Sequence, residues 1–347
     1  MKSPALLLPL ALIALACSGP EADEKSPAVD LGFAAEGPQA EIVVDGLMNP
    51  SGVTFDAKGR LTVCDSGHGR VLVVENGKPK DWLTGFDTEY WKIDAKTGDE
   101  RFKLGPLNAI WMPNGQLVVS DSGKKDGEDR LGVFDGSGAA DQGKYTNGVA
   151  STTGAEGDLG EGNPTGFALG KGGVVWACGQ GTDAKTWILR CDVDRRTLEP
   201  WASSDDEGIA INSPMQILAE DDQHLLVLYS GAGGKDDGLI ARWNIASRKP
   251  VKTWTLPGLT DPMGMAFFPG SKALAVVDNN WALTEVKSGR LARVTLGDGE
   301  AADVKVLATK LRGPVACCFG PDERLYVAQL GAKFDSTEGS VIAISGL

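Results

Sequence analysis

The chain has 347 residues, 42% of them hydrophobic, and a formal net charge of −13. Phosphate binding needs a basic surface, so this charge argues against a nucleic-acid partner. Its 46 glycines and 18 prolines, with short runs rich in Val and Leu, favour many short strands joined by turns. We therefore expect an all-β protein.

The first 17 residues resemble a bacterial lipoprotein signal. Lys2 precedes an apolar run that is too short to span a bilayer, and Cys17 follows the small residue Ala16. The resemblance implies that residues 1–17 direct the chain to the cell envelope, with Cys17 lipidated and the membrane contacted only through that anchor. Ordinary secretory cleavage nearby is the alternative. Residues 18–40 are small, polar and interrupted by Pro and Gly, which predicts a flexible tether.

Six related segments fill residues 41–347. Each contains a proline, apolar residues three and five positions later, a turn, and a second alternating run such as RLTVCD or QLVVSD; the prolines are Pro50, Pro106, Pro164, Pro214, Pro262 and Pro314. Alternation with a period of two indicates strands, and repeats of about 50 residues are typical of propeller blades. The pattern predicts one domain, a six-bladed β-propeller with four-stranded antiparallel blades. A pair of β-sandwiches would not keep the same columns apolar in all six segments.

Five cysteines remain after Cys17, so at least one thiol has no partner within the chain. Cys178 and Cys191 flank a predicted hairpin loop and face each other in one interpretation, as a disulfide. In the other, the cysteines fill small buried positions as apolar side chains.

Polar side chains are expected around one end of the central channel. In a propeller the first strand of each blade starts where the second strand ends, so both places lie on one face. Asn108, Asn163 and Gln216 lie at first-strand starts, and Asp121 and Asp278 lie at second-strand ends. Carboxylate and amide oxygens suit Ca²⁺, so Asn108, Asp121 and Gln216 are candidate metal ligands. The alternative for each is that it caps a turn.

Two insertions and one further tryptophan add candidates for ligand binding. Residues 87–103 carry Trp91, and the Gly-rich residues 136–163 follow the second segment. Long loops of this kind often form ligand-binding faces. Trp281 follows Asp278 and would lie near the channel mouth, where it could stack on a sugar.

The stretch NPSGVTFDAKGRLTVCDSGHGRVLVV, residues 49–74, resembles an NHL repeat, with His68 and Arg70 near the histidine and arginine of that pattern. The resemblance extends over residues 43–347 and overlaps with gluconolactonase-like six-bladed propellers. It implies a binding scaffold, and for the gluconolactonase group a metal held by acids and asparagines at the channel mouth. That group has an acid directly after the repeated proline. Here the position holds Ser51, Leu107, Thr165, Met215, Met263 and Val315.

Two functions are therefore compatible with the sequence. The first is a non-catalytic scaffold in the cell envelope that binds a small molecule or an envelope protein through its loop-rich face. The second is a Ca²⁺-dependent hydrolase of lactones or esters. With two histidines in the chain, His68 and His224, a zinc site built from several histidines is excluded. The missing acid after the prolines favours the scaffold.

Overall fold

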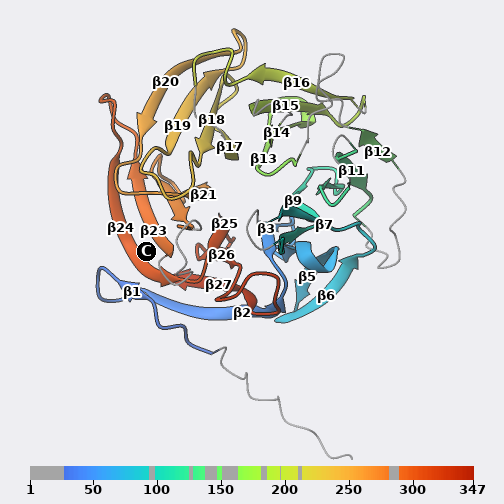
Figure 1. Ribbon diagram of the computed structural model, residues 1–347, viewed down its shortest axis with the longest axis vertical. Helices are drawn as coiled ribbons and strands as arrows, with labels where there is room; N and C mark the ends of the chain where they lie inside the picture. Colours follow the sequence, from blue (N-terminus) through green and yellow to red (C-terminus); the bar gives the residue numbers. More distant parts are fainter. Residues whose placement is uncertain are drawn as a thin grey trace, which may run out of the picture.

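The computed structural model describes residues 27–93, 98–124, 128–136, 147–150, 163–180, 186–195, 197–209, 213–280 and 289–347. Six antiparallel sheets are arranged around a central axis (Figure 1). The predicted six-bladed β-propeller with four-stranded blades is confirmed. Within the described residues, no helix has the length and apolar character needed to cross a membrane.

In the first three blades the strands follow chain order from the axis to the rim. Blade 1 contains β3 (Pro50–Phe55), β4 (Leu61–Asp65), β5 (Arg70–Glu75) and β6 (Lys78–Leu83). Blade 2 contains β9 (Pro106–Trp111), β10 (Leu117–Asp121), β11 (Arg130–Phe134) and β12 (Asn147–Ala150). Blade 3 contains β13 (Phe167–Leu169), β14 (Val174–Gln180), β15 (Thr186–Asp192) and β16 (Thr197–Ser203).

Blade 4 follows the same strand order, whereas blades 5 and 6 are completed at their outer edges by strands from the N-terminal part of the chain. Blade 4 contains β17 (Pro214–Ala219), β18 (His224–Tyr229), β19 (Leu239–Asn244) and β20 (Lys249–Thr255). Blade 5 contains β21 (Pro262–Phe267), β22 (Leu274–Asp278), β23 (Gly289–Thr295) and β24 (Asp303–Leu311), with β1 (Gly32–Phe33) added outside. Blade 6 contains β25 (Pro314–Phe319), β26 (Leu325–Gln329) and β27 (Gly339–Ser345), and its outer strand is β2 (Gln39–Leu47).

Three short elements lie outside the blades. A separate two-stranded sheet, β7 (Glu89–Ile93) and β8 (Glu100–Leu104), is inserted between blades 1 and 2. We call it the inserted hairpin. The two 3₁₀ turns are η1 (Ser66–His68) and η2 (Lys171–Gly173).

The N-terminal strand closes the ring and moves the predicted domain boundary. β2 pairs with β27 over residues 39–47, and β1 pairs with β24 in the neighbouring blade. Leu31 is buried against blades 5 and 6. The tether predicted for residues 18–40 is therefore corrected: residues from about 28 onward are part of the propeller, because their backbone groups complete two sheet edges. Residues 1–26, including Cys17, lie outside the described residues.

Burial follows the position of a strand within its blade. All five residues of β4 are buried, and so are all five of β10, β22 and β26. These second strands are covered on both faces by neighbouring blades, which explains their continuous apolar runs. In β20, at the rim, exposed residues alternate with more covered ones, as expected for a strand with one face in solvent.

Five of the six repeated prolines are the first residue of an innermost strand, and Pro164 lies three residues before β13. The register of β3 shifts between Pro50 and Gly52, and the same shift follows Pro214, Pro262 and Pro314. A β-bulge adds one unpaired residue and re-aims its side chain. The residue after the proline is thereby turned towards the axis.

Cys178 and Cys191 do not form the disulfide that was one interpretation of the sequence. Cys178 lies opposite Ile188, and Cys191 lies opposite Val175, so the two thiols are three residues apart in register. They also belong to different apolar clusters. Cys64, Cys178, Cys191 and Cys317 are free and buried, which fits the interpretation of cysteines as small apolar residues.

Thiol alkylation tests this burial. Burial raises the pKa of Cys191 to about 12, with the neighbouring Asp192 charge adding to it, and burial raises the pKa of Cys317 to about 12. At pH 8 roughly one part in ten thousand of such a thiol is thiolate, against about a quarter for a free cysteine. We expect iodoacetamide to leave the four buried cysteines unmodified in the folded protein and to modify them in guanidinium chloride, as read by mass spectrometry. Modification of the folded protein at Cys191 would contradict the buried position.

Candidate functional site

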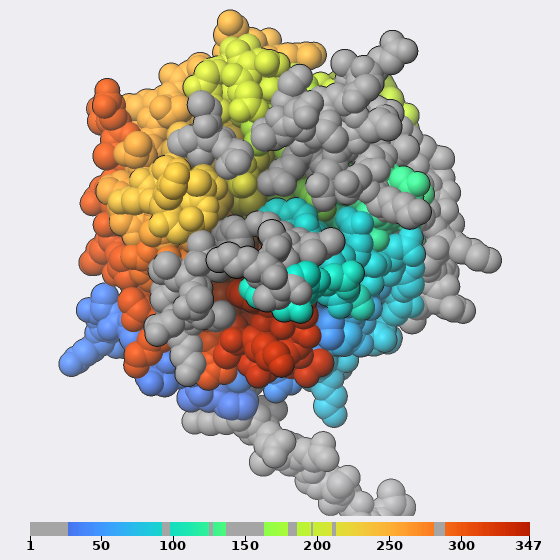
Figure 2. Space-filling model, in the orientation of Figure 1, coloured from blue at the N-terminus to red at the C-terminus, as the bar shows by residue number. Residues whose placement is uncertain are grey.

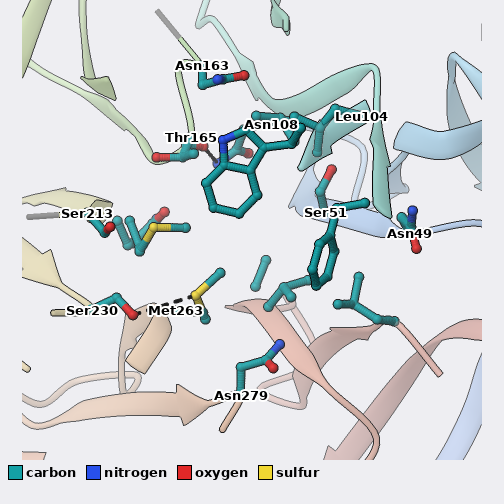
Figure 3. A pocket seen from close by; sticks show the side chains of 18 of the residues that line it. Asn49, Ser51, Leu104, Asn108, Asn163, Thr165, Ser213, Ser230, Met263 and Asn279 are labelled. Atoms are coloured by element: carbon teal, nitrogen blue, oxygen red, sulfur yellow. Dashed lines mark hydrogen bonds between the residues drawn. The ribbon is translucent and has the colours of Figure 1, made fainter. Parts of the chain in front are cut away.

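A cavity of about 150 Å³ lies at the axis, on the face where the innermost strands begin. All six residues that follow the repeated prolines line it, so every blade contributes one position. Figure 3 labels three of them, Ser51, Thr165 and Met263. We call this space the hub cavity. Its lining consists of Asn49, Ser51, Trp91, Phe102, Leu104, Leu107, Asn108, Asn163, Thr165, Ser213, Met215, Gln216, Ser230, Gly231, Met263, Asn279, Val315, Ala316 and Leu330.

The innermost strands approach each other closely at alternate blade junctions. A Cβ on Gly52 would lie 2.9 Å from the Asn108 Cα, and one on Gly264 would lie 2.9 Å from the Ala316 Cα. A Cβ on Gly166 would overlap the Gln216 Cα in the same way. Blades 1, 3 and 5 thus carry a glycine where their neighbours place a side chain. This close contact positions Asn108 and Gln216 at the cavity wall.

Several polar side chains of the hub connect one blade to the next. Ser51 Oγ donates to the Pro106 carbonyl (3.1 Å), and Thr165 Oγ1 donates to the Pro214 carbonyl (3.1 Å). Asn279 Nδ2 donates to the Pro314 carbonyl (3.1 Å). The carbonyls of three repeated prolines are therefore satisfied by the preceding blade. These donors are occupied by the scaffold itself.

The amide of Asn108 is also occupied. Its Nδ2 donates to the Thr165 carbonyl (2.6 Å), and its Oδ1 accepts the Ala109 N–H (2.8 Å). Gln216 differs, because within the described part of the chain its half-buried side-chain amide has no hydrogen-bond partner. The Oδ1 of Asn279, which is 1% exposed, has none either. Within the described part of the chain, both amide oxygens are therefore uncommitted polar groups of the wall.

Asp121 and Asp278 lie outside the cavity lining, although the sequence placed them at the channel mouth. Asp121 is fully buried, and its Oδ2 lies 3.4 Å from Lys124 Nζ and 3.4 Å from Arg130 Nε. Burial raises the pKa of Asp121, while the two cations act in the opposite direction. Asp278 accepts the Asp261 N–H (2.8 Å) and pairs with Arg290 (2.5 Å).

Asp65, at the end of the second strand in blade 1, is paired in the same way as Asp121 and Asp278. Asp65 is buried and accepts hydrogen bonds from the Met48 N–H (2.8 Å) and Arg70 Nε (2.7 Å). His68 Nδ1 lies 2.8 Å from Asp65 Oδ2, the same oxygen that accepts from Arg70. Asp65 and Asp278 fix the turn before the innermost strand, because each accepts a backbone N–H from it. This agrees with the turn-capping alternative for Asp278, whereas Asp121 pairs with two cations.

The hub does not fit a calcium site built from Asn108, Asp121 and Gln216. The Asp121 carboxylate is paired with two cations away from the cavity, and Asn108 Oδ1 accepts a backbone N–H. None of the described lining residues is ionisable, whereas Ca²⁺ sites draw on carboxylates. One group of possible metal ligands, Glu220, Asp221 and His224, does occur among the described residues. It lies at the other end of β18, and Glu220 already forms two 2.6 Å bonds with Arg242.

The structure brings most of the predicted amides and one predicted tryptophan together. Asn108, Asn163, Gln216 and Trp91 all line the cavity. Trp281 lies outside the described residues, as does most of the insertion 136–163, of which β12 is described.

Sequence reasoning missed the apolar part of the wall. Met215 and Met263 follow repeated prolines, and Phe102 and Leu104 come from the inserted hairpin. The sequence did contain a signal, because the six positions directly after the repeated prolines are mostly apolar. This pattern argued against a metal site, and it also predicts a hydrophobic wall.

The comparisons with known proteins support the fold alone. No family model and no curated protein matches the sequence. The aldose sugar dehydrogenase from Streptomyces coelicolor, solved in its PQQ-bound form, is 14% identical with a TM-score of 0.59, covering 89% of this chain and 98% of its own. The gluconolactonase from Xanthomonas campestris is 12% identical with a TM-score of 0.59, covering 92% and 95%.

A third similar structure belongs to another group of proteins. Virginiamycin B lyase from Staphylococcus aureus is 12% identical with a TM-score of 0.54, covering 90% of this chain and 99% of its own. The chain is thus a six-bladed propeller that resembles a dehydrogenase, a lactonase and a lyase in architecture.

Calcium titration of the wild type and Asp121→Asn tests the metal assignment. A ligand at 100 times its dissociation constant stabilises a protein by about 2.7 kcal/mol, which moves the melting temperature by several degrees. We expect millimolar Ca²⁺ or a chelator to shift the melting temperature of both proteins by less than about 1 °C. A rise in melting temperature that depends on Ca²⁺ and is abolished by Asp121→Asn would show that Asp121 is a metal ligand.

Proposed function

We propose that this protein is a non-catalytic, NHL-like binding propeller that holds a small uncharged ligand in the hub cavity. The observation that carries the proposal is the lining itself. All six blades supply a residue to one cavity, and none of the described lining residues carries an ionisable side chain. Small-molecule sites are mostly apolar with a few placed polar groups, and Gln216 and Asn279 supply such groups here.

The size of the cavity limits the ligand. An apolar cavity of 150 Å³ holds a molecule such as benzene, and the hub cavity has about this volume. Met215 and Met263 are unbranched and polarisable, and methionine contacts favourably with aromatic rings. Trp91 adds a flat apolar surface. A single ring with one polar substituent matches these groups.

The absence of charge from the described lining determines which ring is accepted. A buried carboxylate or ammonium without a partner costs several kcal/mol. A neutral donor, by contrast, can bond to the uncommitted amide oxygen of Gln216. We therefore expect strong discrimination between neutral and charged ligands of the same shape.

The lining also supports binding over hydrolysis. A hydrolase needs a nucleophile, a general base or a metal near the substrate. The described wall offers amides, hydroxyls, methionines and apolar side chains, and its Ser51 and Thr165 hydroxyls donate to carbonyls. No histidine or carboxylate stands beside either hydroxyl among the described lining residues. Among the described lining residues, the hydrolase alternative therefore finds no activating group.

Phenol and benzoate provide a matched pair of probes. We expect phenol to bind the wild type in calorimetry and benzoate to bind at least about 100-fold more weakly, because its charge would be buried without a partner. Met215→Trp fills the cavity and should abolish phenol binding. Val251→Trp, on the exposed rim strand β20, is the control and should leave binding unchanged. Equal affinity for benzoate, or turnover of lactones or aryl esters, would contradict the proposal.

We also propose that the protein is held in the bacterial cell envelope by a lipid on Cys17. The support is the sequence of residues 1–17. We expect mass spectrometry of the N-terminal peptide to show a diacylglyceryl group on Cys17, and Cys17→Ala to release the protein from the membrane fraction. An unmodified N-terminus after another cleavage site would contradict the anchor and would leave the cavity proposal unaffected.

A further inference from the structure

Among the described residues, the uncommitted amide oxygens of the hub cavity lie on one side of it. Gln216 and Asn279 come from blades 4 and 5, whereas Trp91 and Leu104 come from the inserted hairpin. Figure 3 shows Asn279 on one side of the cavity and Leu104 on the opposite side. In Figure 2 the chain near residue 230, in yellow, and the chain near residue 100, in turquoise, lie on the same face of the molecule. A ligand in this cavity would therefore turn its polar atoms towards blades 4 and 5.

Gln216 occupies the same position in blade 4 as Asn108 does in blade 2, two residues after the repeated proline. The shorter amide of Asn108 is used by the scaffold, because its Nδ2 donates to the Thr165 carbonyl (2.6 Å) and its Oδ1 accepts the Ala109 N–H (2.8 Å). Gln216 has one more methylene, which carries its amide away from its own backbone. Within the described part of the chain, neither its Oε1 nor its Nε2 has a hydrogen-bond partner. Gln216 therefore keeps an acceptor and a donor for a ligand.

The scaffold fixes the place from which the Gln216 amide reaches the cavity. Its backbone belongs to β17, where it lies opposite Leu228 of β18. A Cβ on Gly166 of blade 3 would lie 2.7 Å from Gln216 Oε1, so the amide rests against a backbone without a side chain. The Gln216 amide is therefore bounded by the blade 3 backbone on one side and by the cavity on the other.

Asn279 adds a second acceptor to the same side of the cavity. Its Nδ2 donates to the Pro314 carbonyl (3.1 Å), and its backbone N–H donates to the Asp261 carbonyl (2.9 Å), so its position is fixed. Among the described residues its Oδ1 has no hydrogen-bond partner, although Asn279 is only 1% exposed. Figure 3 shows this side chain directed towards the cavity. A buried acceptor without a donor is costly, so a ligand N–H or O–H that reaches it is favoured.

The Gln216 amide presents a donor beside an acceptor on one planar edge. A cyclic amide, or lactam, carries the complementary edge, because its ring N–H lies beside its carbonyl. Glutamine forms two-point pairs of this kind with the donor and acceptor on the edge of adenine. A ligand that matches only one of the two groups removes water from the other without replacing its hydrogen bond, which lowers affinity. Gln216 therefore discriminates between rings by the arrangement of their polar atoms.

We propose that the ligands of the hub cavity are small lactam rings, and that Gln216 is the residue that selects them. The inference rests on the binding function proposed above and narrows its ligand class from neutral single rings to neutral cyclic amides. The ligand N–H donates to Gln216 Oε1, and Gln216 Nε2 donates to the ligand carbonyl. The rest of the ring contacts the apolar lining, including Met215 and Met263. A second N–H on the ring, where there is one, donates to Asn279 Oδ1.

2-Pyridone and 4-pyridone are matched probes of this selection. They are isomers of the same size as phenol, with the ring N–H beside the carbonyl in 2-pyridone and opposite it in 4-pyridone. We expect 2-pyridone to bind the wild type at least about tenfold more tightly in calorimetry, because only this isomer forms both hydrogen bonds with Gln216. Equal affinity for the two isomers, or tighter binding of 4-pyridone, would overturn the inference.

Gln216→Leu and Gln223→Leu form a matched pair of variants. Each replaces one glutamine of blade 4, but Gln223 is exposed in the turn before β18 and is not a lining residue of the cavity. We expect Gln216→Leu to lower the ratio of 2-pyridone to 4-pyridone affinity by about tenfold, and Gln223→Leu to leave the ratio unchanged. A preference for 2-pyridone that survives Gln216→Leu would show that another group selects the ligand.

The side-chain amide of Gln216 also gives a signal in the wild-type protein. Its Nε2 protons are assigned in NMR spectra by through-bond correlation to the Gln216 backbone, so this measurement needs no variant. We expect saturating 2-pyridone to shift this signal, and the Gln223 amide signal to stay in place. A Gln216 amide signal that does not move while 2-pyridone binds would contradict the pairing.

Phenol separates a failure of this inference from a failure of the proposed function. If phenol binds and the wild type does not prefer 2-pyridone, the cavity remains a binding site and the role of Gln216 is wrong. If 2-pyridone binds through Gln216 and phenol does not bind, the inference stands and phenol is outside the ligand class. If neither phenol nor either pyridone binds, both the inference and the proposed function are wrong.

Discussion

Closure of the ring by β2 is the constraint on which the rest of the structure depends. A single blade is a four-stranded sheet whose second strand is buried on both faces, so it needs a neighbour on each side. The last blade obtains its outer strand from residues 39–47, which pair with β27 at the other end of the chain. This pairing places blades 6 and 1 in contact and removes the free face that an open array would expose.

The closed ring in turn decides what chemistry the hub can offer. Six innermost strands must meet around one axis, and glycines at Gly52, Gly166 and Gly264 allow the closest approaches. Strand starts at this distance leave backbone carbonyls that need donors, and the hub's serine, threonine and asparagine side chains supply them. The polar groups are therefore largely consumed by assembly. What remains at the cavity surface among the described residues is mostly apolar and uncharged, with the amide oxygens of Gln216 and Asn279 uncommitted.

The acidic side chains at the ends of the second strands are likewise occupied by contacts within the propeller. Asp65, Asp121 and Asp278 each lie opposite an arginine on the third strand. Their burial is tolerable because each carboxylate has a cation or backbone N–H beside it. The aspartates at the ends of these second strands therefore form ion pairs within their own blades. Asp335, in contrast, accepts hydrogen bonds from Phe102 and Lys103, which belong to a segment outside the blades.

The sequence by itself determined the architecture, because strand alternation and the repeated proline are local patterns that every blade must satisfy in order to pack against its neighbours. It also indicated Asn108 and Gln216 as residues of one face, which the shared direction of the innermost strands requires, and it indicated Asn163 and Trp91 as further residues of that face. Only the tertiary structure decided that Asp121 turns towards Arg130, that residues 28–40 complete sheet edges, and that Asp335 meets Phe102. These contacts join residues distant in sequence, and local periodicity carries no information about which of two available partners a buried carboxylate or a free sheet edge will choose.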